Sequence, residues 1–306
     1  MERRLRSWLM TSPTQPQDRP EQSAVLAWFE ANARELQWRA PGASAWSVLV
    51  SEFMLQQTPV ARVLPVHEQW LERWPTPASL AAEPAGEAVR LWGRLGYPRR
   101  ALRLHAAAVA ITEQHGGEVP ASYDALLALP GVGDYTAAAI ASFAFGHRHV
   151  VLDTNVRRVH ARWLRGEEFP AAGVNRAERD LADSVLPQDP ATAATWSVAV
   201  MELGALVCTS AQPRCERCPL HGSCAWVAAG SPAYDGPPRR AQTWAGTDRQ
   251  CRGRLLAVLR EADAPVPRQR FDLAWHDEVQ RRRCLESLLA DGLLVSAGPN
   301  TYALPG

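Results

Sequence analysis

The chain has 306 residues, of which 46% are apolar and 21% charged, and its formal net charge is only +1. These values are ordinary for a soluble globular protein with one large domain or two smaller ones. They exclude a uniformly basic nucleic-acid-binding surface, so any such surface must be a local patch. All 33 basic residues are arginines. Because the chain has no lysine, catalysis through a lysine Schiff base is excluded.

The N-terminal 22 residues are predicted to be a disordered lead-in, because Thr11–Pro20 is polar and rich in proline. The arginines near the N-terminus are not followed by the apolar segment of a signal peptide, and no stretch reaches the ~18–20 apolar residues of a membrane-spanning helix. Four of the six cysteines lie close together late in the chain, unlike a spread disulfide framework. We therefore expect a cytoplasmic protein.

Between residues 23 and 226, short segments with apolar residues at helical spacing are separated by proline and glycine. No apolar and polar residues alternate over any length there, so we predict an all-α region. The predicted helices include Val25–Phe29, Trp46–Leu55, Val89–Trp92, Leu102–Ile111, Ala137–Phe145, Val156–Leu164 and Trp196–Leu206.

The composition changes after the last clustered cysteine. Residues 227–249 are rich in Ala, Gly, Pro and Arg, which predicts a linker. Helical spacing returns in Arg252–Glu261 and His276–Ala290, and a hairpin-like end follows with a turn at 298–300. Residues 250–306 therefore resemble a winged-helix α/β module, although a small packing domain with no role in DNA binding accounts for the same pattern.

A glycine-rich turn lies between helical segments at Leu129–Asp134. Gly131 and Gly133 permit a tight turn, and backbone N–H groups there, including that of Val132, can point at a phosphate together with the start of the next helix. This pattern is typical of a helix-hairpin-helix element, which holds the DNA backbone without reading sequence. A plain turn between two helices is the alternative.

Four cysteines follow one another within 17 residues and can surround one metal centre. They are Cys208, Cys215, Cys218 and Cys224. Zinc ribbons usually present two CxxC pairs and this segment has one, so the spacing is compatible with both a [4Fe–4S] cluster and a structural zinc site. Arg214 and Arg217 in the same loop are candidate phosphate contacts.

Two carboxylates stand in unusual contexts. Glu52 lies in an apolar helical segment, where an acid is costly unless it is used or paired. Asp153 follows an apolar run and precedes a predicted helix, so it is a candidate helix N-cap, a role compatible with catalysis.

The order of these features resembles the helix-hairpin-helix glycosylases. Within that superfamily, the segments SEFMLQQT, LWGRLGYPRRA, LPGVGDYTAAAIASFAFG, LDTNVRRVHAR and MELGALVCT resemble the A/G-specific adenine glycosylases, the MutY family. The resemblance covers about residues 23–226. It implies a two-lobed all-α fold, with a helical barrel lobe at about 40–149 and a cluster lobe formed by 23–39 and 150–226. It also implies a [4Fe–4S] cluster on the four cysteines, with zinc the less favoured metal.

The resemblance also implies roles for individual residues. Glu52 would protonate N7 of a flipped adenine, and Asp153 would stabilise the oxocarbenium-like sugar. Tyr135 and Asn155 would orient these acids. Trp38 and Arg39 would line the adenine pocket, and Gln57 and Tyr97 would fill the gap in the duplex. For Trp38 and Tyr97, a place in the core is the alternative.

The implied activity is removal of adenine mispaired with 8-oxoguanine or guanine in double-stranded DNA, by a monomer, in base-excision repair. Tyr135 stands where endonuclease III-type relatives carry a lysine nucleophile, so we expect a monofunctional enzyme that leaves an intact abasic site.

Several positions depart from the family pattern. Pro98 stands where the family often has a second aromatic residue, and Thr154 stands where glycine is common. Val198 stands where relatives have an amide or carboxylate that contacts adenine. The tail after Cys224 is also shorter than the 8-oxoguanine-reading domain of longer members. A monofunctional glycosylase for another base or mispair, or a non-catalytic iron–sulfur DNA-binding protein, therefore remain alternatives.

Overall fold

A computed structural model describes residues 19–236 and 244–306. Most of the predicted lead-in (residues 1–18) and the middle of the predicted linker (237–243) lie outside the described residues. Helices dominate the described ranges, as predicted, and strands occur only near the C-terminus. None of the helices described is both long enough and apolar enough to cross a membrane.

The helices and strands have these bounds: α1 (Pro20–Asn32), η1 (Gln37–Arg39), α2 (Ala45–Leu55), α3 (Val60–Arg73), α4 (Pro77–Ala81), α5 (Ala85–Trp92), α6 (Arg99–Gln114), α7 (Tyr123–Leu127), α8 (Asp134–Phe145), α9 (Thr154–His160), the π-helical η2 (Ala161–Arg165), α10 (Arg176–Val185), α11 (Pro190–Leu206), η3 (Cys215–Arg217), η4 (His221–Ser223), α12 (Ala225–Ala228), α13 (Asp248–Arg260), β1 (Val266–Pro267), α14 (Gln269–Asp272), α15 (Glu278–Ala290), β2 (Val295–Gly298) and β3 (Thr301–Ala303).

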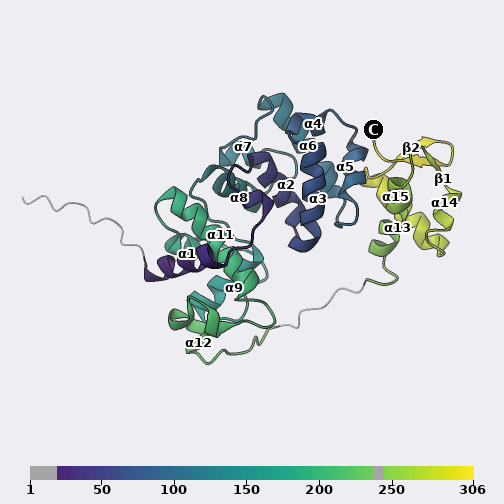
Figure 1. The fold of residues 1–306 in the computed structure, drawn as a ribbon. Coiled ribbons are helices and arrows are strands. Elements are labelled where there is room, and N and C mark those ends of the chain that lie inside the picture. Colours follow the sequence, from purple (N-terminus) through teal and green to yellow (C-terminus); the bar gives the residue numbers. More distant parts are fainter. Residues whose placement is uncertain (1–18, 237–243) are drawn as a thin grey trace, which may run out of the picture. The chain divides into compact units, whose positions relative to one another are not determined.

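The chain divides into two compact units, each of which is assembled from distant parts of the sequence. The first contains Met1–Ala33 and Thr154–Pro232, and the second contains Arg34–Asp153 and Ala233–Gly306. In the first unit, α1 packs against α11, and α11 packs against α9 (Figure 1). Gln22 of α1 donates from Nε2 to the carbonyl oxygen of Val185 at 2.9 Å. The N-terminal helix is therefore an integral part of this unit.

The second unit is built around α2. Every residue from Trp46 to Met54 is buried, and the helix packs against α3, α6 and α8. A cluster of indole rings packs edge to face in the same core, with the Trp70 ring centre 4.7 Å from that of Trp74 and 5.8 Å from that of Trp92. A helix buried on all sides needs a largely apolar sequence all round, which the segment supplies apart from Ser47, Ser51 and Glu52.

The C-terminal part of the second unit, residues 244–306, is here called the C-terminal module. It contains α13, α14, α15 and an antiparallel sheet of order β1-β3-β2 (Figure 1). The predicted helices and hairpin are present, but β1 and α14 were not predicted, because segments of two and four residues are too short to show a periodicity. The structure also has α3, which the sequence reading missed because Pro65 interrupts its middle.

The segment predicted as one helix from Val156 to Leu164 changes character part of the way along. It is α-helical to His160 and π-helical from Ala161 to Arg165. Single π-helical turns within helices often occur at functional sites. Here the turn carries Arg162, whose buried side chain reaches the cysteine loop.

Candidate active site and cysteine loop

Glu52 lies in the buried middle of α2 and is itself buried. The pKa of its carboxyl is raised to about 7, mainly by burial; the nearby Asp153 also raises it, while a hydrogen bond from Tyr135 and the charge of Arg39 lower it. An acid with this pKa keeps its proton over much of the neutral range and can still give it up. The structure thus brings together four of the predicted site residues within the second unit.

Tyr135 is the second residue of α8, directly after the glycine turn. Burial of its hydroxyl, the charges of Glu52 and Asp153 and the hydrogen bond to Glu52 all raise the pKa of Tyr135 well above its usual value. The phenol therefore stays protonated and serves as a donor to the carboxyl. Tyr135 therefore makes a hydrogen bond to Glu52, while its role in orienting the acid during catalysis stays a prediction.

Asp153 directly precedes α9, and its carboxylate is close enough to Glu52 and Tyr135 to change the pKa of both. Asn155 is the second residue of α9, and its Oδ1 accepts a hydrogen bond from Arg158 at 2.9 Å. Its backbone lies against α11 at Gly204, where an added Cβ would lie 2.7 Å from the Asn155 Cβ. Close packing on a glycine fixes the start of this helix within its unit.

The glycine turn connects α7 to α8. Gly131 has φ +79°, and a Cβ there would lie 2.7 Å from the Cβ of Arg103 and 3.1 Å from the ring of Phe53. Gly133 has φ −111° and caps α8, with nothing near its Cα that a Cβ would meet. Val132 is buried and anchors the turn. Gly131 therefore permits tight packing, and Gly133 leaves the N-terminus of α8 open to an anion.

Gln57 and Tyr97 share a feature that the sequence did not reveal. Both have positive φ values, +55° and +47°, which non-glycine residues adopt rarely. Gln57 is exposed, and Tyr97 is 41% exposed. Strained, exposed residues of this kind are typical of binding sites.

The buried Arg100 holds both of these turns, and the sequence reading missed it. Its Nη1 donates to the Phe53 carbonyl at 2.9 Å, and its Nη2 donates to the Thr58 hydroxyl at 3.0 Å and to the Gly96 carbonyl at 3.1 Å. Its guanidinium also lies 5.4 Å from the centre of the Tyr97 ring. The available signal was its place on the apolar face of α6, in line with Leu104 and Ile111.

Trp38 and Arg39 lie in η1. Trp38 is buried in the core and packs edge to face against His67 at 5.0 Å. Arg39 lies close enough to Glu52 and Tyr135 to lower the pKa of both. The role of both residues in lining an adenine pocket stays a prediction. The structure shows only that Arg39 lies close enough to influence Glu52 electrostatically.

The four clustered cysteines lie within electrostatic reach of one another. The pKa of the Cys218 thiol is raised to about 12, mainly by burial; Cys208, Cys224 and Cys215 also raise it, while a backbone hydrogen bond at Leu220 lowers it. Thiolates that repel one another in this way are stabilised when they bind one cationic centre together. Within residues 19–236 and 244–306, however, no three His, Cys, Asp or Glu side chains converge tightly enough for a single metal ion.

Arg162 supports this loop and was not predicted from the sequence. The buried guanidinium donates to the Cys208 sulfur at 3.4 Å and to the Thr209 carbonyl at 2.7 Å, and it lies 4.8 Å from the centre of the Trp226 ring. Arg214 and Arg217 are exposed, as a contact with phosphate requires.

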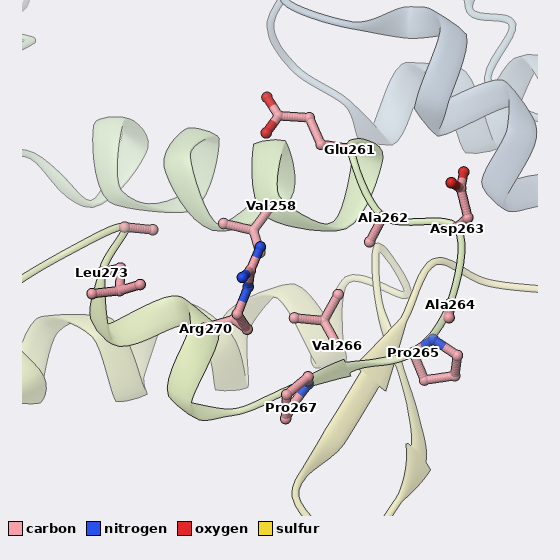
Figure 2. Close-up of a pocket in the computed structure, with 11 residues that line it drawn as sticks. Val258, Glu261, Ala262, Asp263, Ala264, Pro265, Val266, Pro267, Arg270 and Leu273 are labelled. Carbon is pink, nitrogen blue, oxygen red and sulfur yellow. The ribbon is translucent and has the colours of Figure 1, made fainter.

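A separate hollow of about 650 Å³ lies in the C-terminal module between α13, α14 and β1. Figure 2 shows the Arg270 side chain extending from α14 towards Val258 of α13, with Glu261 and Asp263 at the rim. The hollow contains none of the residues described above and is not part of the candidate active site.

The class of protein follows from its similarity to known proteins. The family described as HhH-GPD superfamily base excision DNA repair protein matches residues 50–183. A solved structure of a thermostable thymine-DNA glycosylase superposes with a TM-score of 0.60 and 25% identity, covering 68% of this chain and 95% of that chain. Fold, glycine hairpin and buried acid together define a helix-hairpin-helix DNA glycosylase.

The adenine DNA glycosylase of Mycobacterium tuberculosis (strain ATCC 25618 / H37Rv) is 53% identical over 285 residues, which are 92% of each chain. That of Mycolicibacterium smegmatis is 50% identical over 283 residues, covering 92% of this chain and 95% of the relative. The chain belongs to the adenine DNA glycosylase family, which confirms the resemblance seen in the sequence. These matches include most of the C-terminal module.

Proposed function

We propose that this protein hydrolyses the N-glycosidic bond of adenine mispaired with 8-oxoguanine or guanine in duplex DNA, as the first step of base-excision repair. The observation that carries the proposal is the buried carboxyl of Glu52, whose pKa is about 7 and which lies beside Tyr135 and within electrostatic reach of Asp153. The family relationship supplies the base, since the relatives that match most of this chain are adenine DNA glycosylases.

In the proposed mechanism one carboxyl group donates a proton and the other acts as a carboxylate, as in glycoside hydrolysis. The adenine leaves the base stack, and Glu52 transfers its proton to N7 of the ring. The C1′–N9 bond then breaks, and adenine departs with the bonding electrons. Asp153, as a carboxylate, stabilises the positive charge that develops on the sugar, and water adds at C1′.

The product would be an intact abasic site. Tyr135 occupies the position after the hairpin where lyase relatives carry their nucleophile, and its raised pKa keeps the phenol protonated. With no lysine in the chain, no side-chain amine is available to open the sugar through a Schiff base. We further propose that the enzyme acts as a monomer.

The contacts with DNA would come from the turns described above. The hairpin amides at Gly131–Gly133 and the start of α8 would hold a phosphate. Gln57 and Tyr97, held by Arg100, would enter the space that the flipped adenine leaves. The exposed Arg214 and Arg217 would add phosphate contacts from the cysteine loop.

The cysteine loop would hold a [4Fe–4S] cluster through Cys208, Cys215, Cys218 and Cys224. Two observations support a group held by these thiols: they lie close enough to influence one another electrostatically, and the buried Arg162 donates to the Cys208 sulfur at 3.4 Å. A structural zinc would need its four sulfur atoms about 2.3 Å from the metal. Iron, sulfide and zinc analysis of the purified protein tests this; about four irons and four sulfides per chain are expected, and stoichiometric zinc would contradict it.

A single-turnover assay tests the activity. Duplexes labelled on the adenine strand would carry adenine opposite 8-oxoguanine, guanine, cytosine or thymine, and products would be resolved with and without alkali. We expect alkali-dependent cleavage opposite 8-oxoguanine and guanine and none opposite thymine. Cleavage without alkali would contradict the monofunctional mechanism, and the absence of adenine release from every duplex would overturn the proposal.

A matched pair of variants connects the activity to the site. Glu52→Gln should abolish base release and leave duplex binding intact, because the amide fills the same space but has no acidic proton. Glu68→Gln changes an exposed acid on α3 and should have wild-type activity. If Glu52→Gln retained substantial activity, another group would have to supply the proton.

A further inference from the structure

His67 is a histidine of α3 that makes contacts with two other elements of the second unit. Its ring is completely buried. Nε2 lies 3.0 Å from the carbonyl oxygen of Ser47 in α2, and Nδ1 lies 3.2 Å from Oε1 of Gln37 in η1. The Ser47 hydroxyl is a further neighbour of Nε2, at 3.4 Å. One side chain therefore connects α3 to the elements that carry Glu52 and Arg39.

The hydrogen bonds of His67 do not require a charge on the ring. Burial lowers the pKa of His67 below its usual value, and the hydrogen bond to the Ser47 carbonyl offsets part of this effect. The ring is therefore neutral at pH 7 and above. A neutral imidazole has one N–H, which Nε2 donates to the Ser47 carbonyl, and Nδ1 then accepts from the Gln37 amide, whose N–H group a half-turn presents to it. Both partners are uncharged, so they do not compete with the acid for a proton.

The turn η1 depends on attachments of this kind because it is too short to fix its own position. A single 3₁₀ turn makes few internal hydrogen bonds; here the Arg39 N–H donates to the Leu36 carbonyl at 2.8 Å. The buried Trp38 indole attaches the turn to the core, and this ring packs edge to face on His67 at 5.0 Å. His67 thus contacts η1 twice, through Gln37 and through Trp38.

Arg39 lies in the same turn and acts on the proposed proton donor. Its charge lowers the pKa of Glu52, against the larger effect of burial, and it also lowers the pKa of Tyr135. Asp153 has the opposite effect on both groups. Because the interaction between charges weakens with distance, the influence of Arg39 on Glu52 depends on where η1 holds the guanidinium.

We propose that His67 is a positioning residue for base release: it holds η1 on α2 and α3 and thereby keeps the Arg39 guanidinium beside Glu52. Its ring is completely buried, so it acts through the turn and not by contact with the substrate. The role predicts a specific consequence, because loosening η1 should change the acidity of Glu52. This inference rests on the proposed function, in which Glu52 supplies the proton.

The first test is the pH dependence of single-turnover adenine release. His67→Phe keeps a ring against Trp38 and removes both hydrogen bonds. Gln37→Ala breaks only the bond to η1, at an exposed position where a substitution is unlikely to prevent folding. In both variants Arg39 loses its fixed place, so the pKa of Glu52 should rise and the falling limb of the rate should move about half a pH unit to higher pH. A limb that stays in place in both variants would overturn the proposal.

A double variant shows whether the effect passes through Arg39. Arg39→Gln should move the limb in the same direction, and adding His67→Phe to it should move the limb no further. Additive shifts would overturn the proposal, because His67 would then act by another route. His105→Phe is the matched control, since the His105 ring lies 2.8 Å from the Glu83 carbonyl oxygen and outside η1. It should leave the limb in place, and an equal shift in this control would overturn the assignment to His67.

A second measurement distinguishes this inference from the proposed function. The free energy of unfolding, followed against pH in chains with Glu52 and with Glu52→Gln, gives the pKa of the acid without any catalysis. Gln37→Ala should raise the pKa measured in this way, as it does in the rate profile. Absence of this rise would overturn the positioning role alone. Failure of the wild type to release adenine would instead overturn the proposed function.

Discussion

Tyr135 donates a hydrogen bond to the buried carboxyl of Glu52, so the first turn of α8 is coupled to the middle of α2. The bond favours the ionised acid and opposes the effect of burial, which favours the protonated one. Because α8 begins directly after the glycine hairpin, a contact of the hairpin with DNA and the protonation of the acid depend on the same helix.

Base release should depend on pH through Glu52. Its pKa is about 7, so the protonated form that donates to adenine predominates below that pH, and the single-turnover rate should fall about tenfold per pH unit above it. In Tyr135→Phe the hydrogen bond that favours ionisation is lost, so the falling limb should move to higher pH. Rates measured from pH 5 to pH 9 with saturating enzyme check this; a limb that stays in place or moves to lower pH would refute the coupling.

The same buried acid should cost stability at high pH. The pKa of Glu52 is raised from 4.5 in a solvated chain to about 7, so the unfolded state releases the proton first as the pH rises through this interval, and the free energy of unfolding decreases. Glu52→Gln avoids this loss. Its free energy of unfolding should exceed that of the wild type by about 3 kcal/mol at pH 8 and by little at pH 4.5. Denaturant unfolding at both pH values measures the difference, with Glu68→Gln as the exposed control, which should show no such pH dependence.

The two hairpin glycines should respond differently to alanine. Gly131→Ala forces a side chain into a positive-φ position 2.7 Å from the Arg103 Cβ, and we expect the free energy of unfolding to fall by about 1–3 kcal/mol. Gly133→Ala meets open space at an ordinary φ, so its stability should be unchanged while its affinity for DNA decreases. Thermal unfolding and duplex-binding titrations distinguish the two effects. Equal stability of both variants would contradict this division.

Arg100 should be a structural support of the DNA-facing turns, in contrast to its neighbour Arg99. Removing the Arg100 side chain leaves buried carbonyl groups without their donor, and Arg100→Ala should lose about 3 kcal/mol of stability. Arg99 is exposed and makes an ion pair with Asp291, so Arg99→Ala should change stability by about 1 kcal/mol or less. Unfolding measurements on both variants test the comparison. A mild effect at Arg100 would mean that Gln57 and Tyr97 keep their conformations without it.

Much of the helical architecture was predictable because it depends on local patterns. The segments around Trp46–Leu55 and Ala137–Phe145 have apolar residues at helical spacing, and both form helices close to the expected bounds. The pattern failed where it was interrupted or too short. Pro65 concealed α3, and the two residues of β1 have no detectable period.

The arginines mark the limit of prediction from local sequence. Arg100, Arg162 and Arg249 look alike in a chain whose basic residues are all arginine. In the structure, the first is buried under two turns, the second is buried beside the Cys208 sulfur, and the third is exposed between two aromatic rings. Their surroundings come from residues distant in sequence, so spacing alone cannot distinguish them.

The sequence by itself determined the chemical inventory of this protein: the four spaced cysteines, the hairpin glycines, the two carboxylates and the absence of lysine. Those are properties of residue type and local spacing. Only the tertiary structure decided that Glu52 has a pKa near 7, because desolvation and the influence of Asp153 and Arg39 depend on chain segments that folding brings together. It alone also placed Arg249 of the C-terminal module 5.0 Å from the Tyr97 ring, since these residues are distant in sequence and hydrogen bonds such as that of Arg260 to Val89 hold the module on α5.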